Sequence, residues 1–121
     1  MELSEAISRL DARKFNGISR QEKIRWLSDL DGMTYGAVIA THRDGGAFTP
    51  YTPETPGNTE LLIPAPHEMV YLWYMEAMVD YACGEFVRYN NAMEQFAAAY
   101  RRFADSYHRQ HSPVSDPRGF R

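Results

Sequence analysis

The sequence predicts a small all-α protein. Its 121 residues are enough for one domain. Apolar residues recur at helical spacing through most of the chain. Segments rich in proline and glycine, residues 43–66 and 112–121, interrupt this pattern. We therefore expect a small four-helix bundle at residues 1–111 that includes a helical hairpin, and an extended C-terminal tail at residues 112–121.

The first helix is expected to start at Ser4, which is a suitable N-cap residue. Leu3, Ile7 and Leu10 follow the helical repeat over about ten residues, and Asn16-Gly17 then breaks the helix, because both residues tolerate positive φ.

The second helix is expected to open at the capping box of residues 19–22, in which the Ser19 hydroxyl and the Glu22 carboxylate satisfy free amides. Asp31-Gly32 is expected to interrupt or kink this helix, and the Asp-Gly-Gly of residues 44–46 to end it. Its apolar stripe comprises Trp26, Leu30, Met33 and Ala37.

Residues 43–66 form a connection longer than the ~12–15 residues of an ordinary loop, so we expect a segment that is either functional or disordered. Pro50, Pro53 and Pro56 recur every third residue, as in polyproline II, and residues 61–63 could form a short strand. We expect a stiff arm that reaches a neighbouring subunit. Its contact residues would be Phe48, Pro50, Tyr51, Pro53, Leu61, Leu62 and Ile63.

The third helix is expected from near Pro66 to about Ala82, and it is apolar nearly all round, so it must be covered nearly all round. A fourth helix follows a break between Cys83 and Asn91, either at Gly84 or at a second capping box starting at Asn91. It carries a seam with steps of three and four residues, formed by Phe86, Tyr89, Met93, Phe96, Tyr100, Phe103 and Tyr107.

Composition excludes several classes of protein. Cys83 is alone, so it cannot form an internal disulfide or part of a cysteine-rich metal cage. The net charge of −3 argues against a basic nucleic-acid groove. The N-terminus does not resemble a secretory signal, and the most apolar run, residues 69–79, is shorter than the ~20 residues that span a bilayer. The chain also has an excess of aromatic residues and methionine (8 Tyr, 6 Phe, 2 Trp and 6 Met), which are common in protein cores and are also enriched at protein interfaces.

Three clusters could in principle carry chemistry, and each has a simpler interpretation. Glu76 and Asp80 share a helix face and could be a catalytic pair or a polar stripe. His108 and His111 could bind a metal, but His42 and His67 are expected in distant loops and no third ligand is evident. The arginines of the last helix (Arg88, Arg101, Arg102 and Arg109) could contact phosphate, but acidic residues interleave with them.

Several segments together resemble a known family. They read EKIRWLSDLDG at residues 22–32, FTPY at 48–51, TELLIPAP at 59–66, DY at 80–81 and GEFVRYNN at 84–91. In this order they resemble the head–tail connector, or adaptor, proteins of siphophage-type tailed phages, over roughly residues 19–111. The resemblance implies a helical virion protein of the neck, assembled in the host bacterial cytoplasm, that forms a ring, usually of twelve copies, beneath the portal.

Further expectations follow from the resemblance. The subunit would act without catalysis and without a cofactor, and its partners would be its own copies, the portal protein and the next neck or tail-completion protein. DNA would pass through the ring without specific binding, along lumen-facing acidic residues such as Glu54, Glu60, Glu76 and Asp80. A C-terminal segment would dock on the portal, here through Pro113, Val114, Pro117, Phe120 and Arg121. The alternatives are a small helical DNA-associated regulator and a small metal-dependent enzyme.

Overall fold

The computed structural model describes residues 1–42 and 46–111. Helices dominate these residues, and no named strand occurs among them, so the all-α prediction is confirmed. The elements are α1 (Leu3–Arg13), α2 (Arg20–Ala37), the short 3₁₀ helix η1 (Ile39–Thr41), α3 (Met69–Ala82) and α4 (Phe86–Gln110).

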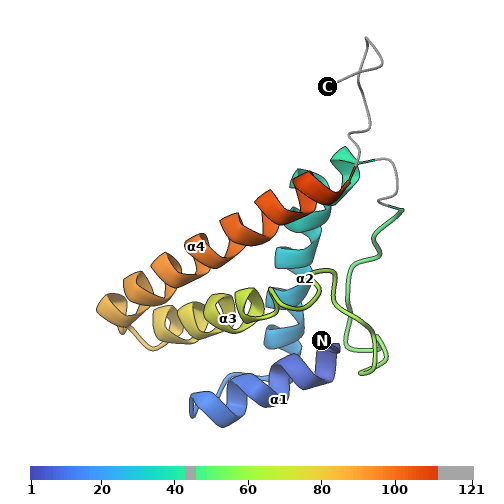
Figure 1. Ribbon diagram of the computed structural model, residues 1–121. Helices are drawn as coiled ribbons and strands as arrows, with labels where there is room; N and C mark the ends of the chain where they lie inside the picture. The colour runs from blue at the N-terminus through green and yellow to red at the C-terminus, as the bar shows by residue number, and fades with distance from the viewer. Residues whose placement is uncertain (43–45, 112–121) are drawn as a thin grey trace.

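An antiparallel hairpin of α3 and α4 forms one side of the molecule (Figure 1). Helix α2 runs across this hairpin, and α1 packs against both α2 and α3. The connection between α2 and α3 lies on the other side of α2, away from the turn that joins α3 to α4 (Figure 1). The two ends of the molecule therefore differ: the turn between α3 and α4 lies at one end, and the irregular α2–α3 connection lies at the other.

The first helix begins at Leu3, so the prediction of Ser4 as the N-cap residue was wrong. Glu2 occupies the cap position without a side-chain hydrogen bond. The α2–α3 connection supplies acceptors instead: the amides of Leu3 and Ser4 donate to the carbonyl oxygens of Thr59 and Gly57, each at 2.9 Å. Free amides at a helix start need some acceptor, and here it comes from a distant segment rather than from a local side chain.

The second helix starts where predicted, because the Ser19 hydroxyl accepts a hydrogen bond from the Glu22 amide at 3.1 Å. The Glu22 carboxylate, which the capping box would turn back to an amide, instead pairs with Arg25 at 2.5 Å. It continues through Asp31-Gly32 without a break and ends at Ala37, before η1. The expected interruption at Asp31, and an end as late as residues 44–46, were both wrong. Val38 and Ile39, which are both buried, turn the chain into the core at this earlier point.

The turn between α3 and α4 is a Schellman motif centred on Gly84. Gly84 has a φ of 75°, its amide donates to the Tyr81 carbonyl at 3.1 Å, and the Glu85 amide donates to the Asp80 carbonyl at 2.8 Å. Helix α4 begins immediately afterwards and passes through Asn91. Of the two possible break points, the chain therefore uses Gly84 and not the second capping box.

The core is built around α3, whose Val70, Tyr71, Leu72 and Met75 are fully buried. The predicted seam of α4 faces it: Phe96 and Phe103 are buried, and Tyr100 and Tyr107 continue the row at ring-centroid distances of 5.6–6.0 Å. Phe86 does not belong to this core. Its ring contacts Tyr81 at 5.7 Å, but the side chain stays 57% exposed because α3 ends one residue after Tyr81, at Ala82.

The α2–α3 connection is mostly irregular. In place of the short strand expected at residues 61–63, there is one isolated bridge between Glu2 and Glu60. Among the described helices, none is long and apolar enough to cross a membrane.

Candidate functional site

A buried carboxylate, Asp31 of α2, joins three parts of the chain. The Tyr71 hydroxyl of α3 donates to its Oδ1 at 2.7 Å. The Tyr51 hydroxyl and the Leu62 amide, both of the α2–α3 connection, donate to its Oδ2 at 2.6 Å and 3.1 Å. The Tyr71 hydroxyl in turn accepts from the Ile63 amide at 2.7 Å. This network pins the connection to the helical core at two points.

Burial is the main influence on the titration of this network. It raises the pKa of Asp31, and the hydrogen bonds from Tyr51, Tyr71 and Leu62 offset only part of that effect. The pKa values of Tyr51 and Tyr71 are also raised, by burial and by the neighbouring Asp31. Both hydroxyls therefore remain protonated and able to donate at all physiological pH values.

The predicted contact residues of the arm are divided between the core and the surface. Tyr51, Leu61 and Ile63 are buried within their own chain, so the prediction that they reach a neighbour was wrong: the Asp31 network draws them inward. Phe48 and Leu62 are partly buried, and Phe48 packs on Tyr35 and Tyr51 with ring centroids at 6.2 Å and 5.4 Å. Pro50 and Pro53 are exposed, and they are the arm residues of that group that stay available to a partner.

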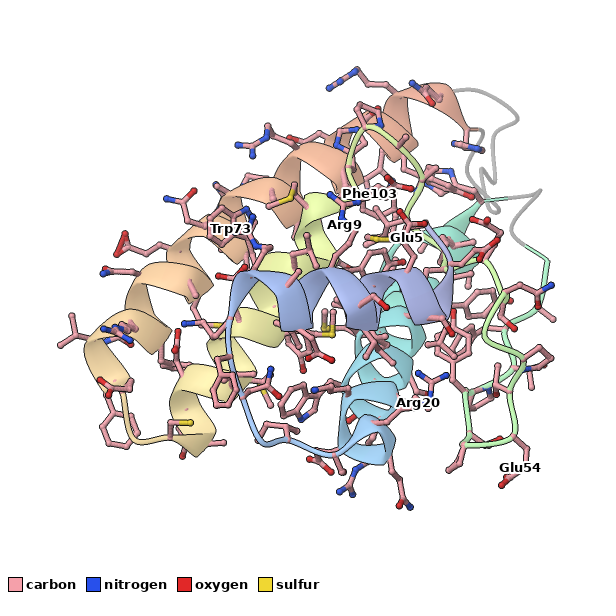
Figure 2. The ribbon with its side chains drawn as sticks, turned by 90° about the horizontal axis from the view of Figure 1, so that it is seen from below. Glu5, Arg9, Arg20, Glu54, Trp73 and Phe103 are labelled. Atoms are coloured by element: carbon pink, nitrogen blue, oxygen red, sulfur yellow. The ribbon has the colours of Figure 1, made fainter. Side chains whose placement is uncertain are left out.

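The four acidic residues predicted to face a channel lie in different settings. Glu54 is exposed at the outer edge of the connection (Figure 2). Glu60 is also exposed, with its carboxylate 3.2 Å from the Met1 amino group. Glu76 and Asp80 instead form ion pairs with the end of α1.

Those ion pairs explain the polar stripe on the otherwise apolar α3. The Arg13 guanidinium donates to Glu76 and lies over the Trp73 ring, 5.5 Å from its centroid. The Lys14 ammonium donates to Asp80 at 2.9 Å. The stripe therefore faces basic residues of the same chain, and it fastens α1 to α3. Each of the two carboxylates therefore has its own basic partner from the end of α1.

The histidines lie closer together than the sequence predicts. His42 was expected in a distant loop, but its Nε2 lies 2.8 Å from Nδ1 of His108, and its ring centroid lies 5.8 Å from that of His111. The spacing of 66 residues gives no local signal for this contact. In the described part of the chain, no three His, Cys, Asp or Glu side chains are arranged to hold a metal ion.

A group of exposed apolar side chains lies at the turn of the α3–α4 hairpin, and the sequence did not indicate it. Tyr81, Phe86 and Val87 are 58%, 57% and 76% exposed. They are three of the five large apolar side chains that are exposed in residues 1–42 and 46–111. The Tyr81 ring contacts those of Phe86 and Tyr89 at 5.7 Å and 5.2 Å. We call Tyr81, Phe86 and Val87 the hairpin tip.

A hollow of about 600 Å³ lies between the first half of α2 and the connection. We call it the α2 groove. Its lining residues are Ser19, Gln21, Glu22, Ile24, Arg25, Ser28, Asp29, Tyr51, Thr52 and Pro53. The Tyr51 amide donates to the Ser28 hydroxyl at 3.0 Å, which fixes the wall formed by the connection against α2. The shape of the groove therefore depends on the attachment of the connection to α2.

The predicted docking residues of the tail (Pro113, Val114, Pro117, Phe120 and Arg121) lie outside the described residues. No model of a known protein family matches the chain, no curated protein matches it, and no solved structure matches it.

Proposed function

We propose that this chain is a head–tail connector of a tailed phage, a structural subunit that forms a ring beneath the portal and extends the DNA channel toward the tail. In this proposal, residues 1–111 are a small helical bundle with an arm at residues 43–66, and residues 112–121 dock on the portal. The protein acts through its contacts with other subunits during assembly and genome ejection, and it catalyses no reaction. Its location is the neck of the virion.

The hairpin tip is the observation that carries this proposal. Large apolar side chains gathered on one exposed feature are typical of a protein–protein contact. The rest of the described surface carries few of them, Phe15 and Met33 being the other two. A connector needs such surfaces, because each subunit must bind its neighbours and at least one further protein of the neck.

Electrostatics are compatible with the same role. A channel wall that lets DNA slide must avoid clustered Lys and Arg, and the chain carries a net charge of −3. Glu54 and Glu60 are exposed and could face such a channel, whereas Glu76 and Asp80 are already neutralised by Arg13 and Lys14.

Docking on the portal tests this function. Purified chain and the portal protein from the same phage or prophage should cosediment, and negative-stain microscopy should show an added ring on the portal. A variant that lacks residues 112–121 should lose cosedimentation and keep the helical circular dichroism of the full chain. A full-length protein that never binds portal would contradict the proposal, and docking by the shortened variant would remove the role of the tail.

A DNA-associated regulator is the second candidate, and one observation favours it. The arginines of α4 (Arg88, Arg101, Arg102 and Arg109) are all exposed, and none forms an ion pair within the part of the chain that the structure describes. The two candidates differ in whether the chain binds DNA in a salt-dependent way, because phosphate contacts release counterions.

A further inference from the structure

We propose that the hairpin tip of one copy docks in the α2 groove of the next copy. This inference rests on the proposed function, since it names the surfaces by which connector subunits would meet. It is independent of portal binding, because both surfaces belong to the described part of the chain.

The hairpin tip is suited to enter a hollow. It stands at the end of two antiparallel helices, which the Schellman turn at Gly84 closes tightly (Figure 1). Phe86 and Val87 are the first two residues of α4 and are mostly exposed, while Tyr81 packs its ring on Phe86. Tyr81 and Phe86 therefore pack on each other at the end of the hairpin, and Val87 is next to Phe86 in the chain.

The α2 groove is suited to receive this tip. Its volume of about 600 Å³ is within the ~300–1,000 Å³ range of binding pockets. Of its apolar lining residues, Pro53 is exposed while Ile24 and Tyr51 are buried, and the other lining residues are polar. Met33, one helical turn beyond Asp29 and outside this lining, adds an apolar side chain that is 49% exposed. Because Tyr51 is bound to Asp31, the groove is already formed before a partner arrives.

Charge complementarity favours a second copy of this chain as the partner that binds in the α2 groove. Arg88 follows the tip directly, and Asp29 lies on the rim of the groove. Neither side chain forms an ion pair within residues 1–42 and 46–111. The rim cation, Arg25, pairs with Glu22 at 2.5 Å and senses Asp29 only at longer range, so Asp29 is the rim charge without an ion pair of its own in the described residues. Docking of the tip would bring Arg88 to Asp29.

The chain cannot satisfy this contact by itself, because the tip points away from the α2–α3 connection that forms one wall of the groove (Figure 1). A contact between two unlike surfaces of identical subunits is heterologous. Repetition of such a contact gives a ring when the rotation closes and a filament when it does not.

Cross-linking tests this contact, because Cys83 is exposed beside the tip and is the only cysteine of the chain. A Gln21→Cys variant adds a thiol to the groove, and mild oxidation should then produce a ladder of covalent trimers and larger species. The matched control is Ser8→Cys, whose thiol would lie on the exposed face of α1, away from the groove. It should give no ladder beyond dimers. Equal ladders from both variants, or none from either, would overturn the proposal.

Charge exchange provides the second arm of the test. In the Gln21→Cys background, Arg88→Glu and Asp29→Arg should each lower the yield of the ladder about tenfold, and their combination should restore it. Arg102→Glu, equally exposed on α4 but far from the tip, should leave the yield unchanged. Failure of the double variant to recover would show that these two side chains do not meet. A ladder without any portal binding would support this contact while removing the connector function, and portal binding without a ladder would do the reverse.

Discussion

Asp31 shows how one side chain can determine the position of a distant segment. It is fully buried in α2, yet its three hydrogen-bond donors come from residues 20 to 40 positions away. In sequence, Asp31-Gly32 resembles a helix interruption, since both residues are common in turns. Inside the protein the same carboxylate is the acceptor that holds Tyr51 and Leu62 of the connection. Nothing in the local sequence identifies those partners.

Substitution of Asp31 by Asn should destabilise the protein by about 1–3 kcal/mol. Tyr51 and Tyr71 donate to different carboxylate oxygens, and the amide replaces one of those acceptors with a donor. Urea unfolding followed by circular dichroism measures the change. Asp29→Asn, two residues earlier and exposed, is the control and should shift stability by less than about 0.5 kcal/mol. Equal stability of the two variants would show that the network contributes little.

The difference in unfolding free energy between the wild type and Asp31→Asn should also depend on pH. Burial raises the pKa of Asp31 above its ordinary value of 3.8, so near and above that pH the folded protein retains a proton that the unfolded chain releases. The stability contributed by this group is therefore fully present below pH 3.8 and is lost as the pH rises through the folded pKa. We expect the difference in unfolding free energy between the wild type and Asp31→Asn to shrink as pH rises. A difference that grows with pH would mean that hydrogen bonding outweighs burial.

At the scale of elements, the hairpin depends on the backbone conformation of one residue. Gly84 has a φ of 75°, and a Cβ added there would meet nothing within 4 Å. Gly84→Ala should therefore cost about 1–2 kcal/mol through backbone strain alone. Gly36 is the matched control: it lies near the end of α2 without positive φ and also has open space around it, so Gly36→Ala should stabilise by about 0.5–1 kcal/mol. Thermal unfolding should show shifts of opposite sign, and shifts of the same sign would contradict this account.

The elements themselves were largely predictable, because their signals are local. The capping box at Ser19, the break at Gly84 and the aromatic repeat on α4 each depend on residues within one or two helical turns. The errors occurred where a contact joins distant segments. The connection caps α1, Asp31 draws Tyr51 and Ile63 inward, and His42 meets His108 across 66 residues. The hairpin tip was missed because the heptad pattern places Phe86 in the buried seam, whereas Phe86 lies at the end of α3, where it contacts Tyr81 and stays exposed.

At the scale of the whole molecule, charge is distributed unevenly. The chain has a net charge of −3, yet α4 carries four arginines against two acidic side chains, Glu94 and Asp105. This is the feature on which the connector and the DNA-associated regulator disagree. A regulator would bring the arginine row to phosphate, and each phosphate contact would release counterions and make binding depend steeply on salt.

We expect the isolated chain not to bind a short duplex, even at low salt. Glu94 and Asp105 are exposed among the arginines, so the potential over α4 is weaker than its four cations suggest, and the acidic remainder of the chain opposes approach. Fluorescence anisotropy of a labelled duplex at about 0.01 M salt, where the Debye length is about 30 Å, is the most sensitive condition. As a positive control, a Glu94→Lys, Asp105→Lys double variant should bind weakly and release the duplex as salt is added. Binding by the wild type that falls steeply with salt, and that Arg101→Ala weakens, would contradict the connector proposal and favour the regulator.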